Sequence, residues 1–229
     1  MKNNTNNILY YDAIAPEYNN MMENDADKIV RGKVGNKFCS IVKDGAVLDF
    51  GAGTGLDIQW LTDKGFTVFF CEPSSGMRER AITAHSNLQH NKIIFLDNSV
   101  TNFRQWHLQL PFSEKVDAVL SNFAVLNCIP DIEFLFQSLT LVVKPGGNMI
   151  VLVLTKKLKN KLSLNFRSMF KSFIQHVPVT INMRYKKHEQ TVYIYSIKEI
   201  IKASAKHFIL CSTEVLPASD FTLIHLKHK

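Results

Sequence analysis

The chain has 229 residues, of which 46% are hydrophobic and 21% are charged, and its mean hydropathy is −0.03. This composition is that of a globular protein with a sizeable core, and it excludes a disordered chain. No apolar run approaches the ~18 residues of a membrane-spanning helix, and residues 1–12 lack the hydrophobic centre of a secretion signal. We therefore expect a single domain located in the cytoplasm.

The net charge of +7 has a local origin. Residues 156–187 contain nine basic side chains and no acidic one, whereas the rest of the chain has 18 basic and 20 acidic residues. This distribution predicts one basic surface on an otherwise mildly acidic protein. The four cysteines lie far apart, and no pair has the spacing of metal ligands, so we expect free thiols and no metal site.

The first 44 residues are predicted to form a largely helical cap, and an alternation of strands and helices follows from Gly45. Short apolar runs predict five strands, at 46–50, 66–72, 92–97, 115–122 and 148–155. Helices are expected from near Leu56, from the serines of "SSGM" and over 132–143, where "KPGG" signals a turn. Continuous apolar strands that alternate with helices indicate a parallel sheet covered on both faces.

The pattern changes after Thr155. The stretch "KKLKNKLSLNFRSMFKSFIQH" has an apolar helical stripe and a basic opposite face, which predicts an amphipathic helix. Next, "QTVYIY" predicts a short strand, and a helix is expected from near Ser196. The chain then ends in two predicted strands joined by "PASD", which indicates a terminal hairpin.

The stretch "VLDFGAGTGLD" joins the first predicted strand to a helix, with glycine at positions 51, 53 and 55. Alternate glycines let the backbone approach a ligand, at the sheet edge where open α/β folds bind ligands. Leu56 replaces the third glycine of a dinucleotide fold, and no G-K-[ST] follows, so pyrophosphate and triphosphate ligands are disfavoured. Asp49 suits an ammonium group, and Glu72, which ends the second strand, could accept hydrogen bonds from ribose hydroxyls.

With these features the sequence resembles the class I S-adenosylmethionine-dependent methyltransferases, in their small-molecule, methyltransferase-11/25-like branch. The resemblance rests on D-x-G-x-G-x-G at 49–55 and on Glu72, together with "SSGM", "LDNS", "VVKPGG" and the opening "YYDAIAPEY". It implies an α/β fold, with a Rossmann-like, doubly wound, seven-stranded, mostly parallel sheet, an antiparallel C-terminal hairpin strand and helices on both faces. The parts of this single domain, 1–229, would be a cap (1–44), a cofactor-binding core (45–155), a basic substrate or lid insertion (156–190) and a C-terminal helix and hairpin (191–229).

The resemblance also implies a site for S-adenosylmethionine, whose product is S-adenosylhomocysteine (SAH). The residues implied around its methionine part and sulfonium are Asp49, Gly51, Gly53, Gly55, Asn122 and Phe123. Glu72 would hold the ribose, and those implied at the adenine are Met77, Asp97 and Asn98. Two tyrosines, Tyr11 and Tyr18, would cover the cofactor, with plain helix packing as the alternative. The predicted site also includes Ala52, Pro73 and Ser99.

No catalytic residue is identified by the sequence. Methyl transfer from a sulfonium needs mainly alignment and exclusion of water, and it needs a general base only where the acceptor must lose a proton. The sequence "SNFA" replaces the [N/D]-P-P-[Y/F] of nucleobase-amine methyltransferases, and "NC" stands where many relatives have a histidine. His107, His176 and His188 remain as candidate bases, with surface or packing roles as the alternative.

The sequence thus predicts methyl transfer to oxygen, nitrogen or carbon of a small molecule, which could be anionic. The alternatives are an RNA or protein methyltransferase, a non-catalytic S-adenosylmethionine-binding domain and, more distantly, a nicotinamide oxidoreductase. The basic segment 156–187 could close over the acceptor, bind an anionic partner or, through 156–175, touch an anionic membrane. No stable nucleic-acid partner is expected, because no RNA-binding module is visible. Both a monomer and a homodimer are compatible with the sequence.

Overall fold

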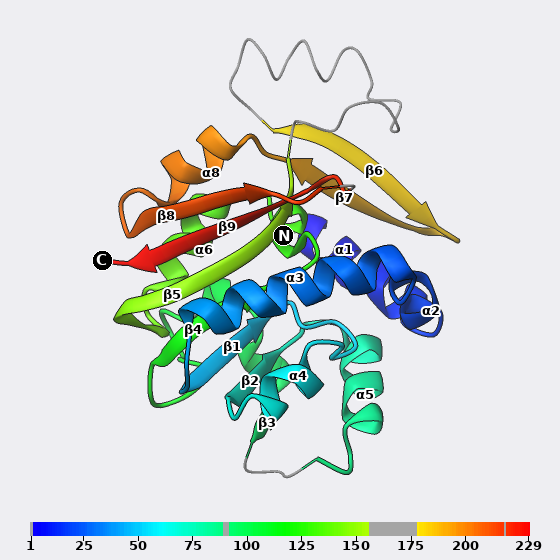
Figure 1. The fold of residues 1–229 in the computed structure, drawn as a ribbon. Coiled ribbons are helices and arrows are strands. Elements are labelled where there is room, and N and C mark those ends of the chain that lie inside the picture. Colours follow the sequence, from blue (N-terminus) through cyan, green and yellow to red (C-terminus); the bar gives the residue numbers. More distant parts are fainter. Residues whose placement is uncertain (1, 89–91, 156–177, 218) are drawn as a thin grey trace.

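A computed structural model describes residues 2–88, 92–155, 178–217 and 219–229. Its centre is a seven-stranded sheet in the order β3-β2-β1-β4-β5-β9-β8 (Figure 1). The strands are β1 (Ala46–Phe50), β2 (Thr67–Cys71), β3 (Ile93–Phe95), β4 (Val116–Ser121), β5 (Val143–Leu154), β8 (Phe208–Val215) and β9 (Phe221–His228). Strands β1 to β5 are parallel, and β9 is antiparallel to both β5 and β8. The predicted mostly parallel sheet with an antiparallel C-terminal hairpin is confirmed.

Helices cover both faces of this sheet. The described helices are α1 (Lys2–Ile14), α2 (Tyr18–Met22), α3 (Asp25–Ile41), α4 (Ile58–Asp63), α5 (Ser75–Ala84), α6 (Ile132–Leu139) and α8 (Ile197–Ser204). Short 3-10 helices are η1 (Asn98–Val100), η2 (Phe103–Gln105) and η3 (Val125–Cys128). Because side chains alternate along a strand, Val47 of β1 packs in one core cluster with Phe38 of α3, and Leu48 packs in another with Leu135 of α6. Burial on both faces explains the continuous apolar runs of the sequence.

Strand β5 begins at Val143, five residues before the predicted start, and α6 ends at Leu139 instead of 143. The "KPGG" sequence, predicted to be a turn between the two, lies inside the strand. There the pairing with β4 shifts register: Val116 is paired with Val143, and Ala118 is paired with Asn148. Proline and glycine therefore form a bulge at this place, a role that glycine often has within strands.

A second sheet of two strands was not predicted. Strand β6 (Val179–Tyr185) pairs with β7 (His188–Ile194) in an antiparallel hairpin. The predicted substrate or lid insertion at 156–190 thus ends in a strand pair, whereas its predicted amphipathic helix lies outside the described residues. Tyr185 of this hairpin donates a hydrogen bond of 2.9 Å to Glu17, beyond the end of α1, and its ring meets that of Tyr10 edge-on at 6.4 Å between centroids. The hairpin is therefore fixed against the N-terminal helices.

The helix and strands of the C-terminal part agree with those predicted from the sequence. Ser196 caps α8 in a capping box with Glu199, which explains why this helix begins where its serine predicts. Strands β8 and β9 form the predicted hairpin. Among the described residues, no helix combines the length and the apolar character that crossing a membrane requires.

Candidate functional site

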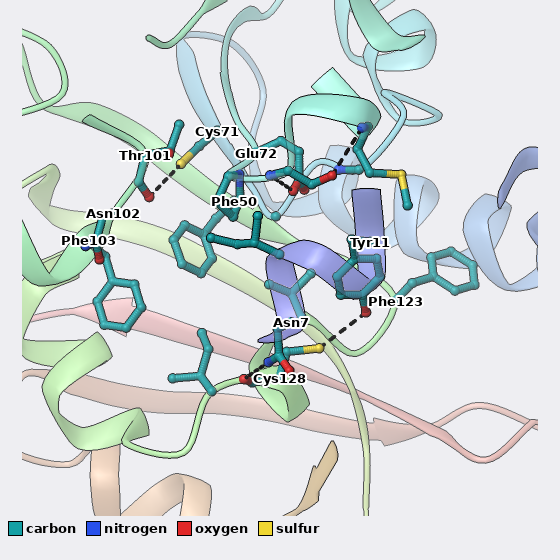
Figure 2. A pocket seen from close by; sticks show the side chains of 18 of the residues that line it. Asn7, Tyr11, Phe50, Cys71, Glu72, Thr101, Asn102, Phe103, Phe123 and Cys128 are labelled. Atoms are coloured by element: carbon teal, nitrogen blue, oxygen red, sulfur yellow. Dashed lines mark hydrogen bonds between the residues drawn. The ribbon is translucent and has the colours of Figure 1, made fainter. Parts of the chain in front are cut away.

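A pocket opens beside the carboxyl ends of β1, β2 and β4, with α1 on one side of it (Figure 2). A second, smaller pocket adjoins it, since both are lined by the same five residues, Tyr18, Gly51, Gly53, Asn122 and Phe123. The site therefore lies at the switch between β1 and β4, where the strand order reverses and open α/β sheets bind ligands.

The glycine loop forms the boundary between the two pockets. Its start is held to β2 by the backbone N–H of Gly51, which donates to the carbonyl of Cys71 at 2.9 Å. Gly51 has a φ of +73°, and a Cβ atom there would overlap the side chain of Val125. A left-handed backbone next to a packed side chain permits only glycine at this position. Gly55 lines neither pocket, so its role is in the turn itself, with a φ of +81°.

We expect the substitution Gly51→Ala to reduce the free energy of unfolding by about 1–3 kcal/mol, because it adds backbone strain and steric overlap. Gly32→Ala is the matched control: Gly32 is exposed within α3, and nothing lies within 4 Å of an added Cβ. That variant should gain about 0.5–1 kcal/mol from higher helix propensity. Urea denaturation measures both changes, and equal effects of the two substitutions would contradict a tight loop.

Glu72 lies at the end of β2 with its carboxylate in the larger pocket. One carboxylate oxygen accepts a hydrogen bond from the backbone N–H of Gly53 at 2.9 Å, and the other accepts one from that of Ser74 at 2.8 Å. Burial raises the pKa of Glu72 to about 7, although the two N–H donors oppose this shift. Each oxygen keeps a lone pair for a further donor, so the group can accept two hydroxyl hydrogen bonds from a ligand.

Asp49 lines the smaller pocket and is 1% exposed. Its Oδ2 atom is buried and has no hydrogen-bond partner among the described residues. Burial, together with the nearby carboxylate of Asp57, raises the pKa of Asp49 well above its usual value. A buried carboxylate oxygen without a partner is costly, and a cationic donor in the pocket would remove this cost.

Arg31 and Asp57 also line the smaller pocket, and sequence reasoning did not assign them a role. The guanidinium of Arg31 donates to Asp57 Oδ2 at 2.6 Å and lies 4.5 Å from the ring centroid of Phe123. Asn122 donates to the same Asp57 oxygen at 3.0 Å. Arg31 comes from α3, outside every motif that the sequence showed, so only the packing of this helix reveals it.

Phe123 and Ala124 follow β4 with left-handed φ angles of 49° and 65°. Two consecutive non-glycine residues in this conformation cost free energy, and such strain clusters at functional sites. The turn directs Phe123 to both pockets and begins η3, which carries Cys128. The end of β4 was predicted to flank the reacting group, and in the structure Asn122 and Phe123 line both pockets.

The three residues predicted at the adenine, together with their predicted neighbours Pro73 and Ser99, divide into two groups. Pro73, Met77 and Asn98 line the larger pocket. Asp97 and Ser99 do not: Asp97 is exposed and accepts a hydrogen bond from the backbone N–H of Ser99 at 2.9 Å, which caps η1. Sequence reasoning also missed three residues on this side of the pocket, Thr101, Asn102 and Phe103. No motif marks them: Thr101 and Asn102 link η1 to η2, and Phe103 begins η2.

The first two helices lie against the pocket through the two predicted tyrosines. Tyr11 of α1 lines the larger pocket, and Tyr18, at the start of α2, lines both. Asp12 links α1 to the start of α5: one carboxylate oxygen accepts from Ser74 Oγ at 2.6 Å and from the Gly76 backbone N–H at 2.9 Å. The Tyr-Asp pattern thus has a structural basis, since the aspartate holds the helix that carries the tyrosine.

None of the candidate bases reaches the larger pocket in the described part of the chain. His107 is exposed, His188 is half-buried on β7, and neither lines the pocket. His176 lies outside the described residues. The described residues that line the larger pocket include no lysine, arginine or histidine. Over the described ranges, no three histidine, cysteine or acidic side chains are grouped so that they could hold a metal ion.

A family model described as a methyltransferase domain matches residues 27–203. The chain belongs to this family. The match covers the glycine loop, Glu72 and the end of β4, which therefore lie in a class I S-adenosylmethionine-dependent methyltransferase domain.

Comparison with known proteins places this methyltransferase among relatives of low overall identity. A demethylmenaquinone methyltransferase of Beutenbergia cavernae is 32% identical over 106 residues, which are 46% of this chain and 39% of that protein. The solved DhpI–SAH complex has a TM-score of 0.71 at 16% identity, over 98% of this chain and 96% of the other. A Burkholderia thailandensis 1,6-didemethyltoxoflavin-N1-methyltransferase, solved with SAH, has a TM-score of 0.65 at 12% identity, over 96% and 87%. The solved structures share the fold.

Proposed function

We propose that this methyltransferase transfers the methyl group of S-adenosylmethionine to an oxygen, nitrogen or carbon atom of a small molecule. The observation that carries the proposal is the pair of adjoining pockets at the glycine loop. Glu72 lies in one of them, and Asp49, whose Oδ2 atom has no partner in the described part of the chain, lies in the other. The two carboxylates lie on either side of the glycine loop. This arrangement fits a ligand with a ribose at one end and an ammonium group at the other.

The residues of the two pockets suit the parts of the cofactor in order. Glu72 would accept hydrogen bonds from the ribose hydroxyls, and Asp49 would accept one from the methionine ammonium. Arg31, already paired with Asp57, would attract the methionine carboxylate. The residues that would surround the rest of the cofactor are Tyr11, Tyr18, Gly51, Ala52, Gly53, Pro73, Met77, Asn98, Asn122 and Phe123. Gly55, Asp97 and Ser99 have no support from the pocket geometry and stay predictions.

The bound cofactor supplies an electrophilic methyl group on a positively charged sulfur. The protein's own contribution is to hold the acceptor in line with that group and to exclude water. Since the described side chains of the larger pocket include no lysine, arginine or histidine, and Glu72 would be occupied by the ribose, an acceptor atom that is nucleophilic without a protein base fits best.

A small-molecule acceptor is supported by the names of two relatives, which act on demethylmenaquinone and on 1,6-didemethyltoxoflavin. The chain spans 39% of the first relative's length, so neither compound is transferred to it as a substrate. Several predictions of the sequence remain predictions: an anionic acceptor, membrane contact through 156–175, a cytoplasmic location, and a monomer or homodimer. The segment that suggested the first two lies mostly outside the described residues.

The test combines binding with turnover. We expect SAH and S-adenosylmethionine to bind the full chain in isothermal titration, and SAH to form from S-adenosylmethionine only when a panel of phenols, amines and N-heterocycles is added. Binding without turnover on any acceptor would favour a non-catalytic domain. Turnover on RNA or protein alone, with binding that weakens steeply as salt is added, would favour the nucleic-acid or protein alternative. Binding of NADH in place of SAH would contradict the proposal.

A further inference from the structure

Four polar side chains from distant parts of the chain meet at one end of the larger pocket. Asn7 and Tyr11 lie one turn apart on α1, Cys128 ends η3, and Gln190 belongs to β7. Figure 2 shows Asn7, Tyr11 and Cys128 close together, with Glu72 on the other side of the pocket in this view. This cluster thus lies away from the group that would hold the ribose, towards the space left for an acceptor.

Gln190 fixes the cluster from behind. Its side chain is 3% exposed and does not line the pocket. The amide nitrogen Nε2 donates to Tyr11 Oη at 2.9 Å and to Cys128 Sγ at 2.9 Å. Both hydrogens of this amide are then in use, so Gln190 is a positioning residue for the two side chains in front of it.

The phenol of Tyr11 accepts a hydrogen bond from Gln190, so its own hydrogen points elsewhere. The other contact of this oxygen is with Cys128 Sγ at 3.4 Å, in which either atom could be the donor. Because sulfur is a weak acceptor, an oxygen atom of a ligand would be a better partner for the Tyr11 hydroxyl hydrogen. The Cys128 thiol in turn faces the carbonyl of Ala124 at 3.7 Å. Burial raises the pKa of Tyr11 and raises that of Cys128 to about 11, so both groups stay protonated and uncharged at neutral pH.

Asn7 supplies the complementary acceptor. Its Nδ2 atom donates to the backbone carbonyl of Cys128 at 2.9 Å, which sets the orientation of the amide. The Oδ1 atom is buried and has no partner among the described residues. Buried amide oxygens are normally paired, so this atom, in a side chain that lines the pocket, indicates a donor supplied by a ligand.

The cluster therefore offers one donor and one acceptor, both in contact with Cys128, and no charge. Apolar side chains line the pocket beside it, namely Ile8, Val125 and Ile129. We propose that Asn7 and Tyr11, positioned by Gln190, recognise an uncharged methyl acceptor through an N–H or O–H donor next to a hydrogen-bond acceptor, as in a lactam or a hydroxyl beside a carbonyl, while a different atom of the same molecule accepts the methyl group. This inference rests on the proposed function, because it names the acceptor class of the same site.

The test uses the full chain saturated with SAH and three probes. 2-Pyridone carries an N–H next to a carbonyl, N-methyl-2-pyridone lacks the N–H, and benzoate is an anion. We expect 2-pyridone to bind about fivefold to tenfold more tightly than N-methyl-2-pyridone, as one hydrogen bond predicts, and benzoate to bind no more tightly than the methylated probe. Ligand-observed NMR titration gives the three dissociation constants.

Two variants link this preference to the cluster. Asn7→Leu should bring the ratio of the two pyridone dissociation constants close to one and leave SAH affinity unchanged, whereas Asn20→Leu, on the exposed side of α2, should keep the ratio. Gln190→Leu should also lower the ratio of the two pyridone dissociation constants. If Asn7→Leu does not fold, Gln190→Leu replaces it in the comparison with the unmodified chain. Equal binding of both pyridones, tighter binding of benzoate, or an unchanged ratio in a folded cluster variant would overturn the inference. Loss of SAH binding in the unmodified chain would instead contradict the proposed function.

Discussion

The substitution Glu72→Ala should weaken SAH binding by about 1.5–3 kcal/mol, because hydrogen bonds to a charged group are lost. The carboxylate is already oriented by the N–H groups of Gly53 and Ser74, so it is in position before the ligand arrives. Isothermal titration at pH 8 measures the change. Glu79→Ala, at an exposed position of α5, is the matched control and should leave the affinity unchanged.

The pH dependence of binding provides a second signature of Glu72. Its pKa of about 7 means that part of the free protein carries the proton near neutrality, whereas ribose hydroxyls donate to the ionised form. SAH should therefore bind about tenfold more weakly at pH 6 than at pH 8, with most of the loss below pH 7. Glu72→Ala should reduce this dependence, and what remains would come from Asp49, whose pKa is also raised. An alanine variant with full affinity, or one whose pH dependence is as large as that of the unmodified chain, would show that Glu72 does not hold the ribose.

The substitution Asp49→Asn should have opposite effects on binding and on stability. SAH affinity should fall by about 1.5–3 kcal/mol, because the methionine ammonium loses a charged partner. The ligand-free chain should become more stable by about 1–3 kcal/mol at pH 8, because a buried carboxylate oxygen without a partner is replaced by a neutral group. Titration calorimetry and urea denaturation of the same two proteins measure both effects.

The direction in which the stability gain of Asp49→Asn changes with pH tests whether the buried carboxylate causes it. The pKa of Asp49 is raised in the folded chain, so its contribution favours folding at low pH and is lost as pH rises through the folded pKa. The stability gained by Asp49→Asn should accordingly be larger at pH 8 than at pH 5. A gain that does not change with pH, together with unaltered SAH affinity, would mean that Asp49 has no role in the cofactor site.

The parts of the fold that the sequence predicted are those in which local pattern and tertiary packing agree. Strand β1 begins and ends at the predicted residues, and α8 begins at its serine cap. In both elements the local sequence pattern is continuous and its boundary residues are clear. The start of β5 was predicted wrongly because "KPGG" has the composition of a turn, and only its pairing with β4 shows that these residues are a bulge inside a strand.

The cofactor side of the site was also largely accessible to sequence reasoning. The glycines, Asp49 and Glu72 follow strands directly, so chain order alone brings them to one edge of the sheet. Asp97 shows the limit of this reasoning: it follows β3 in the expected way, yet its side chain turns to its own backbone and caps η1. The residue type alone does not show whether an aspartate side chain will bind a ligand or a nearby backbone N–H group.

By itself the sequence determined the α/β class, the antiparallel C-terminal hairpin and the methyltransferase family, because periodicity and the spacing of glycines and acids are properties of neighbouring residues. Only the tertiary structure decided which side chains face the acceptor. Asn7, Cys128 and Gln190 are separated by more than 50 residues from one another and have no common motif. They meet because β7 contacts both α1 and η3, and such contacts depend on how the elements pack, which no local pattern records.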